Sequence, residues 1–329
     1  MPRPRMLVTL LAAAALCAGL TAPGVQAAST KYKLYTEPAD NYQSVYALIN
    51  GATTSINMTM YELTDTVAEQ DLANAAARGV NVRVILDINR EQSHNTTAYN
   101  YLAGHGVHVV WAPTKYAATH QKTITVDGIT AAIMSGNLTS QYYSTSRDFV
   151  LTDANLIDIA AITKVFNADF AGSSITPTDG DNLVWSPTDA QSKLLALINA
   201  ATSTLSVENE EMADTAITNA LVAAAQRGVQ VHITMTANSS YDTAFNQLVA
   251  AGAKVHLYSA TASLYIHAKV IDVDAALTSH RAYVGSINFS DYSLNKNREL
   301  GFITSDSVID AGLDGTLASD YAGGTNYTG

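Results

Sequence analysis

Apolar and alternating segments recur along the chain, and helical patterns separate them. The segments typical of strands are INMTMY (56–61), VNVRVIL (80–86), VHVVWA (107–112), LSVENE (205–210), VQVHITM (229–235) and KVHLYS (254–259). Helical patterns lie between them, such as TVAEQDLANAAARG, which ends at Gly79 as helices often do, and shorter ones around residues 99–103 and 242–251. Strands that alternate with helices predict an α/β fold, and we expect mixed, mostly parallel sheets flanked by helices. The segments HQKTITVDG and HAKVIDVDA turn at Asp-Gly or a longer loop into the next strand, so antiparallel hairpins are compatible with these sheets.

The same pattern is written twice. LYTEPADNYQSVYALINGA (34–52) matches LVWSPTDAQSKLLALINAA (183–201) at an offset of 149 positions. Further on, HQKTITVD (120–127) returns as HAKVIDVD (267–274) at an offset of 147. We therefore predict two copies of one unit, with the first lobe at residues 29–172 and the second at residues 182–329. A linker rich in Ser, Thr, Pro and Gly, residues 173–181, joins them.

The first 28 residues have the features of a secretory signal peptide. They carry Arg3 and Arg5, an apolar run over residues 6–20, and small residues up to Ala27. We expect secretion, to the extracellular space or the periplasm, once this segment is removed. The remaining chain has 18 − 2 = 16 basic and 29 acidic residues, a formal charge of −13. Cys17 lies in the removed segment, so stability must come from a packed core and not from disulfides.

A small set of polar residues recurs in both units. The pairs are His120 and His267, Lys122 and Lys269, Asp127 and Asp274, Ser135 and Ser286, Asn137 and Asn288, and Asp148 and Glu299. Residues two apart on a strand point to the same face, so His120 and Lys122 are expected to project together. Burying such groups at the head of an apolar strand would cost several kcal/mol without partners, so the set needs a ligand.

An anion fits this set of residues. Two lysines and two asparagines that converge from two units would bind the non-bridging oxygens of a phosphate and stabilise charge in the transition state. One histidine would attack phosphorus while the other protonates the leaving oxygen. Asp148 and Glu299 are placed to hold the unreactive nitrogen of each imidazole. We expect no metal and no other cofactor, because no set of His, Cys and carboxylate residues stands at ligand spacing.

The motif H-x-K-x(4)-D followed by G-S-x-N resembles that of the phospholipase D superfamily, and its two copies resemble the two-motif members. The resemblance implies two similar lobes with the active site at their pseudo-twofold interface. It also implies a phosphohistidine intermediate that water or another alcohol resolves. It assigns the nucleophile to His120 and acid and base catalysis to His267, an order that internal symmetry alone leaves open. Asp127 and Asp274 are then structural, while the substrate-binding residues are Ser135, Ser286, Asn137 and Asn288.

Two features depart from the family pattern. Met134 replaces the first glycine of G-S-x-N in the first copy, and we expect it to narrow the pocket there. The loop between Asp274 and Gly285 is longer and is expected to alter only the surface. Glu62 and Glu211 also recur, at the 149 offset, and two interpretations stay open: solvated residues ahead of a capped helix, or a place on the pocket rim.

The motifs define a reaction and leave the phosphodiester open. A nuclease neutralises many backbone phosphates with lysine and arginine, whereas a chain at −13 without a basic run repels a polyanion. We therefore predict a secreted phospholipase D that hydrolyses phospholipid headgroups to phosphatidic acid, or transfers the phosphatidyl group to another alcohol. Its expected partner is a phospholipid membrane surface or another phosphodiester substrate, with nucleic acid less favoured and no obligate protein partner. A secreted, metal-independent nuclease of the superfamily and a non-catalytic phosphate-binding module are the alternatives.

Overall fold

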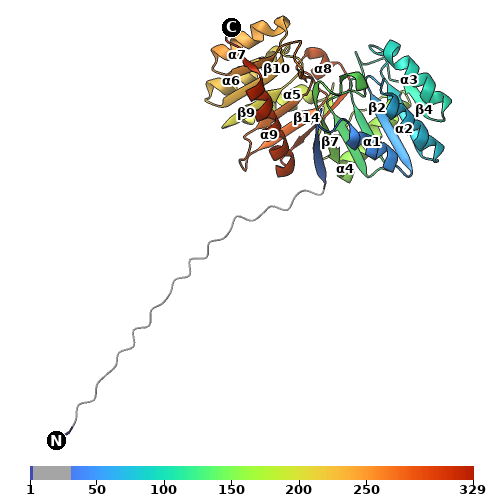
Figure 1. Ribbon diagram of the computed structural model, residues 1–329, viewed down its shortest axis with the longest axis horizontal. Coiled ribbons are helices and arrows are strands. Elements are labelled where there is room, and N and C mark those ends of the chain that lie inside the picture. The colour runs from blue at the N-terminus through green and yellow to red at the C-terminus, as the bar shows by residue number, and fades with distance from the viewer. Residues whose placement is uncertain (3–30) are drawn as a thin grey trace.

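The computed structural model describes residues 1–2 and 31–329. The predicted signal peptide therefore lies outside the described residues, except for its first two. Figure 1 shows two lobes side by side, each with a sheet and helices packed on it. No helix within residues 31–329 combines the length and the apolar character needed to cross a bilayer.

The first lobe is built on a sheet with the strand order β1-β7-β6-β5-β2-β3-β4. Its strands are β1 (Tyr32–Glu37), β2 (Ser55–Met60), β3 (Asn81–Leu86), β4 (His108–Trp111), β5 (Thr123–Val126), β6 (Thr130–Met134) and β7 (Ser146–Asp153). Its helices are α1 (Gln43–Gly51), α2 (Thr66–Ala77), α3 (Gln92–Gly104) and α4 (Leu156–Phe170), with a short 3-10 turn, η1 (Ser140–Tyr142). The strand β12 (Tyr265–Ile266), from the second half of the chain, pairs with β7 and so extends this sheet.

The sheet of the second lobe has the strand order β16-β11-β10-β9-β13-β14-β15-β8. Apart from the added edge strand β16, this is the order of the first lobe read from its other edge, from β4 to β1. Its strands are β8 (Leu183–Ser186), β9 (Thr204–Glu208), β10 (Gln230–Thr236), β11 (Lys254–Tyr258), β13 (Val270–Val273), β14 (Arg281–Gly285), β15 (Glu299–Thr304) and β16 (Thr325–Asn326). Its helices are α5 (Ala190–Ala200), α6 (Thr215–Gln226), α7 (Asp242–Ala250), α8 (Asp291–Asn295) and α9 (Ser307–Gly323), with the turn η2 (Ser239–Tyr241). The shared strand order confirms two α/β lobes of one architecture. Residues 173–181 lie between α4 and β8 without helix or strand, and the exact domain boundaries stay a prediction.

The direction of the strands corrects one part of the prediction. Among the described strands, parallel pairing is confined to β2-β3-β4, β9-β10-β11 and the short contact between β12 and β7. The reason is local, because the chain turns after β5 at Asp127 and Gly128, which both have positive φ (54° and 68°), and returns antiparallel as β6. The sheets are mixed, as predicted, but the prediction that they are mostly parallel is wrong.

The same helix begins in both lobes at an aspartate. The Asp65 side chain accepts a hydrogen bond of 2.9 Å from the backbone N–H of Val67 at the start of α2, and Asp214 accepts one of 2.8 Å from Ile217 at the start of α6. Such a cap satisfies an amide that the helix itself leaves unpaired, and it contributes about 1 kcal/mol. The caps therefore fix where α2 begins after β2 and where α6 begins after β9.

A shared apolar core joins the lobes. Phe149 and Leu151 of β7 belong to the same buried cluster as Val284 of β14 and Phe302 of β15. The labels β7 and β14 lie near the middle of Figure 1, where the two sheets meet. Because these side chains are at most 1% exposed, separating the lobes would expose a continuous apolar surface.

Two ion pairs cross the same interface in a symmetric way. Arg147 of the first lobe donates a hydrogen bond of 2.9 Å to Asp320 on α9, and Arg298 of the second lobe lies 2.8 Å from Asp169 on α4. Breaking a buried pair of this kind by removing one partner costs about 3–5 kcal/mol. The relative orientation of the lobes is therefore held by charge as well as by apolar packing.

Candidate active site

Backbone pairing between the lobes brings the two motifs together. The N–H of Arg298 donates to the carbonyl of Ala118 at 2.9 Å, and the N–H of Gln121 donates to the carbonyl of Arg298 at 3.0 Å. On the other side of the pseudo-twofold axis, the N–H of His267 donates to the carbonyl of Arg147 at 3.2 Å. Each motif histidine is thus held beside a strand of the opposite lobe.

Each histidine is hydrogen-bonded to a carboxylate of the other lobe. His120 Nδ1 lies 2.8 Å from Glu299 Oε2, and His267 Nδ1 lies 2.9 Å from Asp148 Oδ1. Burial opposes ionisation of these carboxyl groups, but the facing imidazole and the nearby lysines hold the pKa of both Asp148 and Glu299 below its usual value. An ionised carboxylate on Nδ1 fixes the tautomer and leaves Nε2 as the reactive nitrogen.

The motif serines lie behind these carboxylates and not in the pocket. Ser135 Oγ donates to Asp148 at 2.6 Å, and Ser286 Oγ donates to Glu299 at 2.9 Å. Both serines are completely buried. The expectation that Ser135 and Ser286 bind the substrate is therefore corrected: their hydroxyl groups orient the carboxylates that hold the histidines.

The two motif lysines are buried beside the histidines. Lys122 is 1% exposed and donates a hydrogen bond of 2.7 Å to the carbonyl of His120, while Lys269 is fully buried and donates to the carbonyl of His267. Burial and the positive charge of Lys269 lower the pKa of Lys122 to about 7. The strands begin only at Thr123 and Val270, so both His-x-Lys segments lie just ahead of their strands instead of on them.

A pocket of about 580 Å³ opens between the lobes at the two histidines. Its lining includes both histidines and both motif asparagines, Asn137 and Asn288, and also Glu62 and Glu211. The structure thus brings the repeated histidines and asparagines to one pocket, while the buried Lys122 and Lys269 lie outside its lining. It also places both glutamates at the pocket wall, while the helix caps next to them are made by Asp65 and Asp214.

Sequence comparison between the repeats missed one carboxylate in this pocket. Glu210 Oε2 lies 3.2 Å from Lys269 Nζ and 3.4 Å from His267 Nε2. The first lobe has Tyr61 at the matching position, 149 residues earlier, and its ring packs edge-on against His120 with the ring centres 4.6 Å apart. A search for residues shared by the two units finds neither Tyr61 nor Glu210, because the two copies differ at this position.

Asp127 and Asp274 fix the strand that precedes each helix. Each carboxylate accepts hydrogen bonds from three consecutive backbone N–H groups: Thr53, Thr54 and Ser55 for Asp127, and Thr202, Ser203 and Thr204 for Asp274. Burial would raise the pKa of Asp274, but these hydrogen bonds lower it to about 2. Both aspartates lie outside the pocket lining, in keeping with the structural role that the family resemblance implies.

The position of Met134 corrects another expectation. Its side chain is fully buried in the apolar core of the first lobe and is absent from the pocket lining, so it does not narrow the pocket. The second lobe has Gly285 at this position, where a Cβ would lie 2.5 Å from the Cα of Gly301 and 2.7 Å from the hydroxyl oxygen of Tyr283. The first lobe has Ala132 where the second has Tyr283. A large residue and a small one thus stand at these two buried positions in each lobe, in opposite order.

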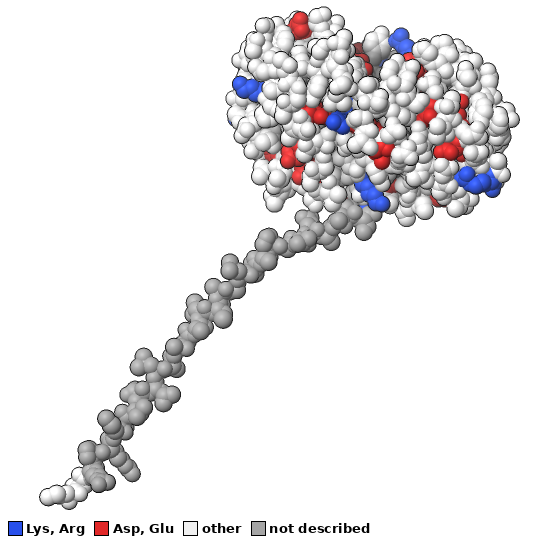
Figure 2. Space-filling model, viewed as in Figure 1, with Lys and Arg blue, Asp and Glu red and all other residues white. Residues whose placement is uncertain are grey.

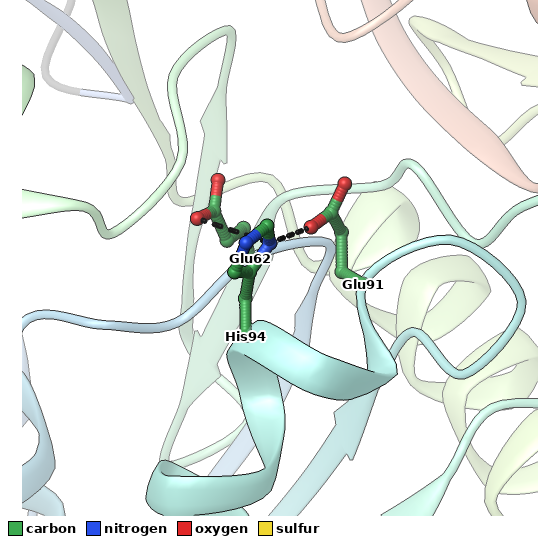
Figure 3. Close-up of side chains that lie close together, drawn as sticks. All are labelled: Glu62, Glu91 and His94. Carbon is green, nitrogen blue, oxygen red and sulfur yellow. Dashed lines mark hydrogen bonds and ion pairs between the residues drawn. The ribbon is translucent and has the colours of Figure 1, made fainter.

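One group of side chains beside the pocket could hold a divalent cation. Figure 3 shows His94 between Glu62 and Glu91, with Nδ1 2.6 Å from a Glu91 oxygen and 3.9 Å from a Glu62 oxygen. Imidazole and carboxylate are ligands that zinc accepts, although the His94 side chain is 63% exposed and is already hydrogen-bonded to Glu91. The second lobe has Ser240 and Thr243 at the positions of Glu91 and His94, so the group is confined to one lobe. The expectation that catalysis needs no metal stays a prediction.

Comparison with known proteins identifies the family. A family model described as cardiolipin synthase, PLD-like domain, matches residues 45–171 and again residues 194–320. Since these two matches cover more than half of the chain, the chain belongs to the phospholipase D superfamily, whose members act on phosphodiesters. The prediction drawn from the two motifs is confirmed.

Solved structures that match most of this chain share its fold at low identity. Polyphosphate kinase from Porphyromonas gingivalis is 14% identical with a TM-score of 0.70, and the match covers 87% of this chain but only 46% of the kinase. Phosphatidylserine synthase from Haemophilus influenzae Rd KW20 is 12% identical with a TM-score of 0.67, covering 89% of this chain and 85% of the synthase. Nuc from Salmonella typhimurium, a phospholipase D family member, is 23% identical with a TM-score of 0.40, covering 45% of this chain and 97% of Nuc. No curated protein matches the chain.

Proposed function

We propose that this protein is a secreted phospholipase D that releases the alcohol headgroup of a phospholipid and leaves phosphatidic acid. The observation that carries the proposal is the pair of histidines from different lobes, His120 and His267, which line one pocket with each Nδ1 held by a carboxylate. Two imidazoles that are held through Nδ1, together with two nearby lysines, provide a nucleophile, an acid and a site for phosphate charge.

In the first step, His120 Nε2 attacks phosphorus and forms a phosphorus–nitrogen bond. The bond from phosphorus to the headgroup oxygen breaks, and that oxygen takes the Nε2 proton of His267, so the headgroup leaves as an alcohol and not as an alkoxide. Lys122, Lys269 and Asn137 stabilise the negative charge on the non-bridging oxygens. Glu299 stabilises the positive charge that develops on His120, because its carboxylate accepts from Nδ1 at 2.8 Å.

In the second step, a water molecule attacks the phosphohistidine. His267, now neutral, removes the proton of that water through Nε2, the phosphorus–nitrogen bond breaks, and phosphatidic acid is released while His120 is regenerated. If another alcohol takes the place of water, the same step produces a new phospholipid. The name of the matching family model, which includes cardiolipin synthase, is consistent with such a transfer.

Surface charge and the pocket mouth favour a lipid over a nucleic acid. The chain without residues 1–28 has a formal charge of −13, and Figure 2 shows isolated basic side chains among acidic ones on the face in view, with no basic stripe there. The pocket lining includes Tyr142 and Tyr265, which are 52% and 38% exposed. Tyrosines with an apolar ring and a polar hydroxyl suit the headgroup region of a membrane.

A product assay tests this proposal. The protein without residues 1–28 is incubated, in the presence of EDTA, with phosphatidylcholine vesicles and separately with single-stranded and duplex DNA, and the His120→Ala variant is the blank. Release of choline and phosphatidic acid with intact DNA is the expected result. Cleaved DNA with intact lipid would overturn the lipid assignment and favour the nuclease, while phosphate binding without turnover of either substrate would favour a binding module.

A further inference from the structure

The two halves of the pocket differ at one pair of matching positions. Tyr61 follows β2 in the first lobe, and Glu210 follows β9 in the second, 149 positions later. Both side chains lie in the pocket lining, next to the histidine of their own lobe. The nearly symmetric site therefore has a phenol ring on one side and a carboxylate on the other.

The carboxylate of Glu210 contacts the lysine, the asparagine and the histidine of the second lobe's motifs. Its Oε2 atom lies 3.2 Å from Lys269 Nζ, 3.2 Å from Asn288 Nδ2 and 3.4 Å from His267 Nε2. Its Oε1 atom accepts a hydrogen bond of 3.2 Å from the hydroxyl of Tyr265. Burial alone would raise the pKa of Glu210, but the charges of His267, Lys269 and His120 hold it far below the usual value, so the carboxylate is ionised.

The first lobe has no carboxylate at the matching place beside its buried lysine. Within the described residues, Lys122 forms no ion pair with a carboxylate; its Nζ donates to the carbonyl of His120 and lies 4.9 Å from the centre of the Tyr61 ring. The hydroxyl group of Tyr61 has Glu91 as its hydrogen-bond partner. A phosphate is therefore better compensated beside His120 and Lys122 than beside Glu210.

This difference orients the substrate. With phosphorus on the side of His120, the leaving oxygen faces His267, which supplies its proton, and the rest of the leaving alcohol lies against Glu210. A carboxylate at that position attracts a positively charged substituent and repels an anionic one, such as the next phosphate of a polynucleotide.

We propose that Glu210 is a specificity-determining residue that selects leaving alcohols with a cationic nitrogen, such as choline or another amino alcohol. The inference rests on the proposed phospholipase D function, since it concerns the headgroup of that same substrate. It also gives the site a local reason, independent of the net charge of the chain, to reject polyanions.

A pair of lipids that differ only in headgroup charge tests the role of Glu210. One is phosphatidylcholine, and the other carries neohexyl alcohol, in which a carbon atom replaces the nitrogen of choline. Both are diluted in neutral detergent micelles so that the surface charge stays the same, and kcat/KM is measured for wild type and for Glu210→Gln. We expect the wild type to prefer the choline lipid and the variant to lose that preference by about tenfold, mainly through slower turnover of the choline lipid.

Two controls separate the possible failures. Glu69→Gln changes a buried carboxylate outside the pocket lining, and its preference should equal that of the wild type. Circular dichroism and thermal unfolding check that Glu210→Gln is folded, and competition by free choline against free neohexyl alcohol tests the same charge preference in the wild type without a variant. An unchanged lipid preference in folded Glu210→Gln, or equal inhibition of the wild type by the two alcohols, would overturn the role of Glu210 while the phospholipase function stands. No hydrolysis of either lipid by the wild type would instead overturn the proposed function.

Discussion

Replacing Asp148 with asparagine should impair the chemistry of a histidine in the opposite lobe. The carboxylate accepts from His267 Nδ1 through both of its oxygens, at 2.9 and 3.1 Å, and it is buried. A hydrogen bond to a charged group contributes about 1.5–3 kcal/mol, which corresponds to a roughly 10- to 150-fold loss in the step that uses the charged imidazole. Asp148→Asn should therefore slow every step in which His267 gives or takes a proton.

The leaving group distinguishes this role from general damage to the site. An alkyl headgroup needs the proton of His267 to depart, whereas a nitrophenolate departs without one. Rapid-quench kinetics should show that Asp148→Asn slows the first turnover of the alkyl phosphodiester by the factor above and leaves the burst of nitrophenol nearly unchanged. Glu299→Gln is the matched variant, and it should slow the first turnover with both leaving groups because it acts on the nucleophile His120.

One result would refute this reasoning. Asp148→Asn could instead slow the nitrophenol burst as much as the alkyl reaction. Asp148 would then not act through the acid His267 alone, and the assignment of His120 as nucleophile and His267 as acid would lose its support. Each replacement keeps the shape of the side chain, so both variants are expected to fold. Thermal unfolding checks that the loss of activity is not due to a loss of folded protein.

Three further predictions concern charge, packing and metal ions. Burial and the charge of Lys269 lower the pKa of Lys122 to about 7, so the lysine loses its charge as the pH rises through 7. Inhibition by sulfate, whose own charge is constant in this range, should therefore weaken above that pH in a titration of its inhibition constant. Gly136→Ala should lower thermal stability by about 1–3 kcal/mol, because the new Cβ would lie 1.9 Å from the hydroxyl oxygen of Tyr42, whereas Gly104→Ala meets no atom within 4 Å and should not. EDTA should leave turnover unchanged, and a loss that zinc restores in the wild type but not in His94→Ala would show that the cluster around His94 holds a required ion.

Much of the fold and the set of site residues could be predicted because the chain is duplicated. Residues kept in both copies at equal spacing, such as His120 and His267, stand out against positions that changed freely. The two-lobe α/β architecture follows from the same repeat. The turn at Asp127 and Gly128 is visible in the sequence, but the antiparallel pairing of β5 with β2 and of β7 with β1 joins distant segments and cannot be read from periodicity.

The details that escaped prediction depend on contacts between distant segments. Spacing says that a carboxylate recurs at Asp148 and Glu299, but only the interface between the lobes decides that each holds the histidine of the opposite lobe. Ser135 was expected in the pocket, although its hydroxyl faces inward to Asp148. Glu210 was missed because repeat comparison selects what is shared, and here the difference from Tyr61 carries the information.

The measurement that tests the central claim most directly is the capture of the covalent intermediate. A phosphodiester labelled in its phosphate is mixed with the protein, the reaction is quenched in base within the first turnover, and the labelled peptide is mapped by mass spectrometry. The account predicts the label on His120 and its loss in His120→Ala. Label on His267 alone would reverse the roles of the two histidines, and turnover without any labelled histidine would contradict the covalent mechanism.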